Sequence, residues 1–307
     1  MNRLPIILSF VLLSGCFTPG NNQGKKESRR PNIILIVADD LGYGNLSCYN
    51  PAARIATPHI DKMAGEGIRF TRFYAGSTVC APSRAALMTG FHMGHAYLRG
   101  NSREALRPQD TTLAQCLQQG GYVTGMFGKW GLGEAGSTGM PHLKGFDEFF
   151  GYLNQRHAHH YFTDHLYEIK GRELKKVKTD STLYSQELIM ERARAFIHTN
   201  KENPFFLYLP VTLPHAELLV PDTLLQEFLN ADGSSKLGPE TPFYQKGRSY
   251  RTQLKPHAAF AAMITRLDRD VGSLLSLLKE LGLDEDTYVF FTSDNGPHKE
   301  GGADPEY

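Results

Sequence analysis

Cys80 opens a short run, C-A-P-S-R, whose residue types could bind and attack a tetrahedral anion. The residues that follow favour a helix ending at Gly90, and Pro82 suits a first helical turn. We therefore expect Cys80 at a helix N-terminus, where unpaired N–H groups favour a bound anion. Arg84, one turn later, can offer the same anion a planar fork of donors. Taken alone, Cys80 could also be a buried structural thiol.

Polar side chains follow two apolar segments that we expect to be buried strands. Residues 32–38 and 287–292 are apolar and rich in β-branched or aromatic residues, which is typical of a parallel sheet. Strand ends in open α/β sheets face the ligand crevice. The candidate ligands at these ends are Asp39, Asp40, Asp294 and Asn295. Their oxygens suit Ca²⁺ or Mg²⁺ better than zinc, although either end alone could be a turn with an aspartate cap.

Together these features resemble the type I sulfatases of the alkaline phosphatase superfamily, whose signature is C-x-P-S-R. The resemblance implies that a maturation enzyme oxidises Cys80 to formylglycine, an aldehyde. One hydroxyl of its hydrate would attack sulfur and release the alcohol, and the second would then expel sulfate and restore the aldehyde. The resemblance also implies a divalent cation, usually Ca²⁺ with Mg²⁺ as the alternative. Its implied ligands are Asp39, Asp40, Cys80, Asp294 and Asn295.

Two further residues take catalytic roles from the same resemblance. Lys129 lies in G-K-W-G-L-G, where the family has G-K-W-H-L-G, and it would contact the sulfate and the formylglycine hydrate. His215 follows an apolar strand in a P-H context and would protonate the leaving alcohol, a task that suits histidine because its pKa lies near neutrality. Gly131 stands where many sulfatases have an active-site histidine. Either another residue, with candidates in residues 155–161, supplies its role, or the subfamily does without it, or activity is weak.

Five more residues are candidates for substrate contact, although His95 and Arg99 are individually more typical of structural or solvated side chains. They are His95, Arg99, His157, His159 and His298. The histidine-rich stretch at residues 157–160 could instead be a surface loop or a zinc site, for which its spacing is a weak signal. We also expect a strand at residues 69–74 that leads the chain to Cys80.

The predicted fold class is α/β, with a mostly parallel or mixed central sheet between helices, as in alkaline phosphatase and the sulfatases. Residues 31–307 would form the N-terminal catalytic domain, because family members continue into a smaller C-terminal subdomain that this sequence lacks. If these residues are the whole product, we expect weak or absent activity and an exposed sheet face or edge.

The N-terminus has the layout of an export signal. Residues 1–15 combine Arg3 with an apolar stretch and resemble a signal peptide that ends in a bacterial lipobox, L-S-G-C. Cys16 would be lipidated, and residues 16–30 would form a flexible tether. The alternative is an ordinary signal peptide with an incidental cysteine. We expect a lipoprotein of the bacterial periplasm or outer membrane, in contact with membrane only through its lipid anchor.

Composition excludes some partners and leaves others open. The formal net charge of the 307 residues is +1, which gives no support for nucleic-acid binding. Cys48 and Cys116 could form a disulfide or remain two separate thiols. The predicted activity is hydrolysis of sulfate esters, with sulfated carbohydrate favoured over aryl sulfate. The alternatives are a phosphoesterase or phosphonate hydrolase of the same superfamily, and a catalytically impaired lipoprotein that binds sulfated glycans.

Overall fold

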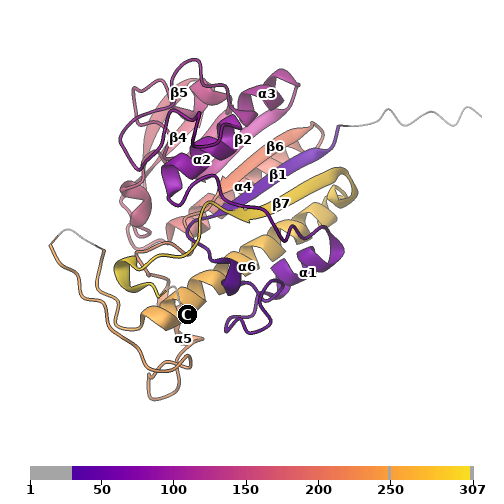
Figure 1. Cartoon of the computed structure of the whole chain (residues 1–307). Coiled ribbons are helices and arrows are strands. Elements are labelled where there is room, and N and C mark those ends of the chain that lie inside the picture. The colour runs from indigo at the N-terminus through magenta and orange to yellow at the C-terminus, as the bar shows by residue number, and fades with distance from the viewer. Residues whose placement is uncertain (1–29, 248–249, 305–307) are drawn as a thin grey trace, which may run out of the picture.

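A single seven-stranded sheet runs through the molecule in the order β5-β4-β3-β2-β6-β1-β7. The computed structural model describes residues 30–247 and 250–304 (Figure 1). Near one edge, β4 pairs antiparallel with both β3 and β5, and all other neighbours pair in parallel. The strands are β1 (Asn32–Ala38), β2 (Val123–Lys129), β3 (Glu148–Tyr152), β4 (His165–Lys170), β5 (Glu173–Lys178), β6 (Phe205–Pro210) and β7 (Thr287–Ser293). The predicted α/β class with a mostly parallel, mixed sheet is confirmed.

Helices cover both faces of the sheet, which makes three layers (Figure 1). The helices are α1 (Pro58–Glu66), α2 (Cys80–Thr89), α3 (Leu113–Gln119), α4 (Ser185–Asn200), α5 (Asp222–Gln226) and α6 (Pro256–Glu280). Short 3-10 turns lie at η1 (Tyr43–Asn45), η2 (Pro141–Lys144), η3 (His157–His159), η4 (Asp284–Asp286) and η5 (Glu300–Gly302). One apolar cluster packs α4 and α6 on one sheet face, and a second packs α2 and α3 on the other.

The central strands are apolar on both sides because both faces are covered. In β1, Ile34 and Ile36 belong to the cluster with α4 and α6, whereas Leu35 and Val37 belong to the cluster with α2 and α3. Strand β6 lies between β1 and β2 and is buried at every position. This double burial fixes the register of β1 and β6, since a slip by one residue would exchange the two faces.

The parallel arrangement brings four chemically important segments to one edge of the sheet. Asp39 directly follows β1, Lys129 ends β2, His215 lies in the loop after β6, and Asp294 directly follows β7. These residues are up to 255 positions apart in sequence, but each lies at or just beyond the carboxyl end of its strand. The fold thereby positions a polar site at this edge.

Several expectations about individual segments need correction or stay open. The strand expected at residues 69–74 is wrong: the segment is irregular, and Phe70, Phe73 and Tyr74 are exposed. Cys48 and Cys116 are both free thiols, which resolves the open question of a disulfide between them. The expected signal peptide, Cys16 lipidation and most of the tether lie outside the described residues.

The burial expected for the strand at residues 287–292 is wrong, because β7 forms the other edge of the sheet and none of its residues is buried. Tyr288 and Phe290, on alternate positions, are 61% and 47% exposed. An edge strand with exposed aromatic residues is open to pairing with another chain. Within residues 30–247 and 250–304, no helix has the length and apolar character needed to cross a bilayer.

Candidate active site

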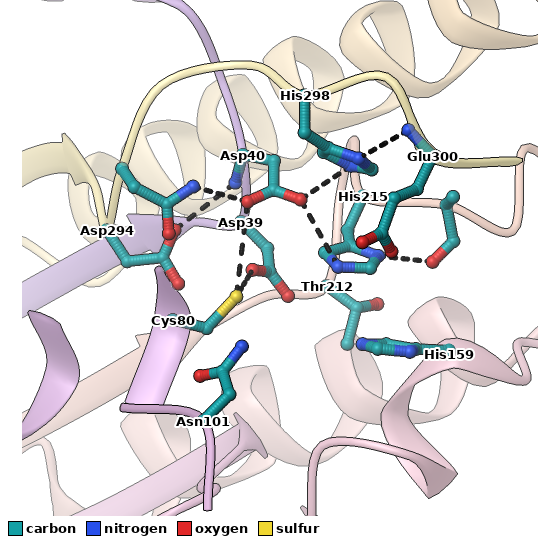
Figure 2. A network of polar contacts seen from close by, with 12 residues as sticks. Asp39, Asp40, Cys80, Asn101, His159, Thr212, His215, Asp294, His298 and Glu300 are labelled. Carbon is teal, nitrogen blue, oxygen red and sulfur yellow. Dashed lines mark hydrogen bonds and ion pairs between the residues drawn. The ribbon is translucent and has the colours of Figure 1, made fainter. Parts of the chain in front are cut away.

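Four potential metal-ligating side chains gather beside the carboxyl edge of the sheet. Asp39, Asp40, Cys80 and His215 each offer one ligand atom, and these atoms all lie within 4.8 Å of one another. All four residues are buried. They come from the loop after β1, the start of α2 and the loop after β6 (Figure 2). A group of buried oxygen, sulfur and nitrogen ligands with this spacing can hold a metal ion.

Cys80 is the first residue of α2, as its sequence context predicts. Val79 is the N-cap, and the backbone N–H of Ala81 donates to Oδ1 of Asn101 at 2.9 Å. The Sγ atom of Cys80 lies 3.2 Å from Oδ1 of Asp39. Burial, and then the charge of Asp39, raise the pKa of Cys80 far above the ordinary range. An unmodified Cys80 is therefore a protonated thiol, which is a poor nucleophile.

Asp39 is ionised because two buried cations surround it. Nζ of Lys129 lies 2.6 Å from its Oδ2, and the guanidinium of Arg84 lies 3.5 Å from its Oδ1. Burial raises the pKa of Asp39, but the charges of Lys129 and Arg84 outweigh burial and hold it well below the usual value. Both cations are fully buried, which they tolerate only because they are paired.

Arg84 also links the helix to the last strand. Its Nε donates to Oδ2 of Asp294 at 2.8 Å, and its NH1 donates to the carbonyl of Lys129 at 2.8 Å. The hydroxyl of Ser83 donates to the carbonyl of Asp294 as well. Helix α2, strand β2 and strand β7 are thus held together through one guanidinium and one neighbouring hydroxyl.

Asp294 and Asn295, the other two ligands expected from the sequence, lie beside Asp40 in the segment after β7. The backbone N–H of Asp40 donates to Oδ1 of Asp294 at 3.2 Å, and the side-chain amide of Asn295 donates to Oδ1 of Asp40. Oδ1 of Asn295 is buried and has no hydrogen-bond partner among the described residues. Burial, and then the charge of Asp39, raise the pKa of Asp294 to about 7. An orphaned buried oxygen beside crowded carboxylates fits a divalent cation, whose charge would satisfy both.

The backbone of Asp40 adopts an unusual left-handed conformation. Asp40 has φ of 61°, and it is the only non-glycine residue with positive φ in the described part of the chain. Aspartate tolerates this conformation better than most residues, but it still costs stability. Such strain is often kept where a side chain must be aimed at a ligand.

Three histidine rings lie next to one another near Asp40. Nε2 of His215 and Nε2 of His298 lie 3.2 Å and 2.6 Å from Oδ2 of Asp40. The ring of His215 is stacked on that of His159 at a centroid distance of 4.1 Å, and the tilted ring of His298 lies 4.8 Å away on its other side (Figure 2). Tyr161 fixes the His215 loop because its hydroxyl donates to the carbonyl of His215 at 2.5 Å. The structure therefore brings His159, His215 and His298 into the site.

The remaining three candidates for substrate contact have their contacts elsewhere. His95 is exposed and pairs with the ring of His92 at 3.0 Å. Arg99 donates to the backbone carbonyls of Ala96 and Gly94. His157 stacks on His165 at 4.3 Å and contacts Thr163 at 2.9 Å. None of the contacts found for His95, Arg99 and His157 within the described chain joins the group around Cys80.

The burial of His157 predicts a loss of stability in mild acid. Burial, and then the neighbouring His165, lower the pKa of His157 to about 4. Since the unfolded value is near 6.5, the unfolded chain binds a proton first as the pH falls. Stability is complete above pH 6.5 and declines from there towards pH 4. We expect His157→Gln to flatten this decline in thermal unfolding measured against pH. His198→Gln, at an exposed position of α4, is the control, and an unchanged decline in His157→Gln would contradict the prediction.

The structure also accounts for Gly131, the departure from the family pattern. Gly131 has φ of +72°, and a Cβ atom built there would collide with the side-chain amide of Gln155. Both amide atoms of Gln155 are buried without a hydrogen-bond partner in the described chain. Gln155 thus fills the space that a side chain at position 131 would need. It lies in the segment that the sequence offered for replacement, but only the tertiary contact singles it out.

Alanine at position 131 should therefore cost more than alanine at another left-handed glycine. Gly136 has φ of +81° with open space around it, so Gly136→Ala measures the backbone cost alone, about 1–2 kcal/mol. We expect Gly131→Ala to lose at least about 1 kcal/mol more in denaturant unfolding, because the methyl group displaces a packed side chain. Adding Gln155→Ala should recover that excess. Equal losses for the two glycine variants would contradict the clash.

Two site residues had no signal in the sequence. Tyr250 lies in an irregular segment before α6, and Glu300 starts η5. The hydroxyl of Tyr250 donates to Oε2 of Glu300 at 2.7 Å and lies 3.4 Å from Nδ1 of His159. No hydrophobic period or motif surrounds either residue, so only the folded structure connects them to the histidine stack.

At the carboxyl edge of the α/β sheet, a buried thiol lies among carboxylates, a lysine and an arginine. The lysine and the arginine can bind an anion, and the carboxylates can bind a cation. The chain belongs to the Sulfatase family, whose sequence model matches residues 31–306. It is 30% identical to the N-acetylgalactosamine-6-O-sulfatase of Bacteroides thetaiotaomicron, over 96% of this chain and 64% of that protein. It is 32% identical to the N-acetylgalactosamine-6-sulfatase of Rattus norvegicus, over 89% of this chain and 52% of that protein.

Solved structures of relatives share the fold. The structure of Ps i-CgsB matches with a TM-score of 0.72 and 29% identity, over 90% of this chain and 61% of that one. The same protein has also been solved in complex with k-i-k-neocarrahexaose. A phosphonate monoester hydrolase of Agrobacterium radiobacter, at 19% identity and a TM-score of 0.61, shares the fold alone. The chain spans 52% to 64% of the length of the two curated relatives named above.

Proposed function

We propose that this chain carries the nucleophile, cation and sulfate-binding groups of a sulfatase that hydrolyses sulfate esters of carbohydrates. Membership of the Sulfatase family and the names of its relatives support this reaction class. The observation that carries the proposal is the environment of Cys80, a buried and protonated thiol against Asp39, with Lys129 and Arg84 beside that carboxylate. These cations suit a sulfate group, and the carboxylates suit a metal ion.

Oxidation of Cys80 to formylglycine would solve the problem of its weak nucleophilicity. The raised pKa of the thiol argues against direct attack by sulfur. A hydrated aldehyde supplies hydroxyl groups at the same place. In the proposed reaction, the ester sulfur gains a bond to a hydroxyl oxygen of residue 80 and loses its bond to the sugar oxygen. The second hydroxyl then loses its proton as the carbonyl reforms and sulfate leaves.

We assign the divalent cation, Ca²⁺ with Mg²⁺ as the alternative, to Asp39, Asp40, Asp294, Asn295 and residue 80. When bound, the cation would act as a Lewis acid that offsets negative charge on the reacting oxygens. The orphaned Oδ1 of Asn295 and the raised pKa of Asp294 support an ion here. His215 lies within the same 4.8 Å group and offers a nitrogen, but its place beside the leaving group suits proton transfer better.

His215 would deliver a proton to the leaving sugar oxygen. Its Nδ1 contacts the carbonyl of Ala216, which leaves Nε2 on the side of Asp40. In the chain alone, burial lowers the pKa of His215 and favours the neutral ring. The negative charge of a bound sulfate ester would favour the protonated ring, so the substrate itself would help to charge its proton donor. Lys129 and Arg84 would hold the sulfate oxygens.

The test combines mass and kinetics on the same preparation. A peptide that contains residue 80 should show the lower mass of formylglycine relative to cysteine. The matured protein should hydrolyse a sulfate ester faster than the matching phosphate ester, and chelation should remove activity that Ca²⁺ restores. Matured protein with full Ca²⁺ that favours the phosphate ester would overturn the proposal in favour of a phosphoesterase. Binding of sulfated glycan without turnover would identify a catalytically impaired binding protein.

We also propose export as a lipoprotein, on the basis of residues 1–16. Cys16 would carry the lipid, and residues 17–30 would separate the catalytic domain from the membrane surface. Labelled fatty acid should enter the wild-type protein but not Cys16→Ser. Equal labelling of both proteins would overturn this assignment.

A further inference from the structure

Glu300 is an exposed carboxylate that two sets of contacts connect to the site (Figure 2). On one side, its backbone N–H donates to Nδ1 of His298 at 2.9 Å, and Nε2 of His298 lies 2.6 Å from Oδ2 of Asp40. On the other side, its Oε2 accepts from the hydroxyl of Tyr250 at 2.7 Å. Its position is therefore coupled to the carboxylate that we assign to the cation.

The Tyr250 contact continues to the proposed proton donor. The hydroxyl of Tyr250 lies 3.4 Å from Nδ1 of His159, whose ring stacks on His215 at 4.1 Å. Nε2 of His159 is buried and has no hydrogen-bond partner among the described residues. A buried ring nitrogen without a partner is costly unless a ligand satisfies it. His159, Tyr250 and Glu300 thus form a polar wall beside His215, where the leaving group would lie.

Tight packing holds Glu300 in this wall. The next residue, Gly301, is buried with φ of +62°. A Cβ atom built on it would lie 2.6 Å from Cβ of Ala216 and 3.1 Å from the ring of Tyr250. The backbone beside Glu300 is therefore wedged between the His215 loop and Tyr250, which restricts where the carboxylate can go.

Among the described residues, the side chain of Glu300 has one hydrogen-bond partner, the hydroxyl of Tyr250. Across residues 30–247 and 250–304, no lysine or arginine forms an ion pair with it, and its Oε1 accepts no hydrogen bond. Glu217, the other glutamate near the His215 loop, is fully buried and paired with Arg251 at 2.7 Å. Within the described part of the chain, Glu300 thus differs from Glu217 in offering an exposed carboxylate oxygen, Oε1, that has no hydrogen-bond partner.

We propose that Glu300, positioned by Tyr250, is a specificity residue that accepts a hydrogen bond from a free hydroxyl of the sugar leaving group and disfavours a second anionic group there. The inference rests on the proposed function and extends it to the class of sugar. A carboxylate is a strong acceptor for a hydroxyl, and an unpaired charge repels a neighbouring sulfate or carboxylate. The preferred substrate is then a singly sulfated unit with a free hydroxyl beside the ester.

The experiment compares three sulfate esters on the full, matured chain: a monosulfated hexosamine, the corresponding disulfated hexosamine, and an aryl sulfate without sugar hydroxyls. Glu300→Ala should lower kcat/KM for the monosulfated sugar about 10–100-fold more than for the aryl sulfate, as expected for a lost charged hydrogen bond. Glu300→Gln keeps an acceptor without the charge, so it should raise the ratio of disulfated to monosulfated turnover about tenfold. Glu285→Gln, at an exposed residue beyond the opposite end of β7, is the matched control.

Each outcome decides the matter. Equal losses on all three esters in Glu300→Ala would show a general effect and overturn the specificity role. An unchanged disulfated-to-monosulfated ratio in Glu300→Gln would overturn it too, as would the same ratio change in Glu285→Gln. A matured wild-type protein that hydrolyses none of the three esters would instead overturn the proposed function on which this inference rests.

Discussion

Replacing Cys80 with alanine is expected to remove activity on sulfate esters, with a loss on the order of 10⁴–10⁶-fold in kcat/KM. Alanine cannot be oxidised to an aldehyde, so no hydroxyl group would face the sulfur atom. The lysine and arginine that would hold the sulfate are retained, so substrate should still bind. The measurement is sulfate release under single-turnover and steady-state conditions, together with binding of the unreacted ester.

Cys116→Ala is the matched control for the loss of a thiol. Cys116 is exposed on α3, whereas Cys80 is only 5% exposed against Asp39. We expect the control to retain wild-type rates and Cys80→Ala to retain most of its stability, since alanine suits the first turn of a helix. If Cys80→Ala hydrolysed the ester at a rate near that of wild type, residue 80 would not be the nucleophile.

Replacing Arg84 with methionine is expected to be the most destabilising substitution in the site, by about 3–5 kcal/mol. The change leaves Asp39 and Asp294 buried without the guanidinium that lies between them. Lys129 still neutralises Asp39, but Asp294 loses its closest cation. The measurement is the free energy of unfolding in denaturant. Arg269→Met, which breaks a half-exposed pair with Glu227, should cost at most about 1 kcal/mol.

The cost of Arg84→Met should also depend on pH and on Ca²⁺. Burial and Asp39 raise the pKa of Asp294 to about 7 even with Arg84 present, well above the ordinary value of 3.8. Between these two values the unfolded chain releases this proton and the folded chain keeps it, so stability falls as the pH rises. Loss of Arg84 should raise this pKa further, so the variant should continue to lose stability above pH 7, where the wild type no longer does. The deficit should therefore be smaller near pH 5 than near pH 8. Saturating Ca²⁺ should recover part of it, and a deficit independent of both conditions would contradict this account.

The parts of the molecule that follow from local pattern could be predicted from the sequence. Both β1 and β7 were recognisable as apolar strands, although only β1 is buried and β7 lies at the edge of the sheet. The rule that parallel strand ends share an edge places Asp39 and Asp294 together. Cys80 was expected at a helix start, because Pro82 and the residues after it favour one, and α2 begins there. The α/β class followed from the same signals. These features depend on neighbours in sequence or on a general property of sheets.

The rest of the site depends on contacts between loops, which leave no periodic signal. Tyr250 and Glu300 come from separate loops and meet through a hydrogen bond beside the closely packed Gly301. The contact between Gln155 and Gly131 likewise exists only in three dimensions. Residues 69–74 show the opposite error. Their aromatic residues favour a strand, which is a local preference. In the fold, the segment pairs with neither β5 nor β7, the two edge strands of the sheet, so it stays irregular.

The enclosure of Cys80 has a consequence for the timing of biogenesis. In the native fold its thiol contacts Asp39, which lies earlier in the chain. Ser83, in the same helical turn, donates to the carbonyl of Asp294, which is synthesised much later. Because Cys80 is only 5% exposed, we expect its side chain to be inaccessible to a modifying enzyme once β7 has docked against β1. The oxidation that we propose must therefore take place on the nascent or still-unfolded polypeptide, and protein that folds first would be trapped with an inert thiol.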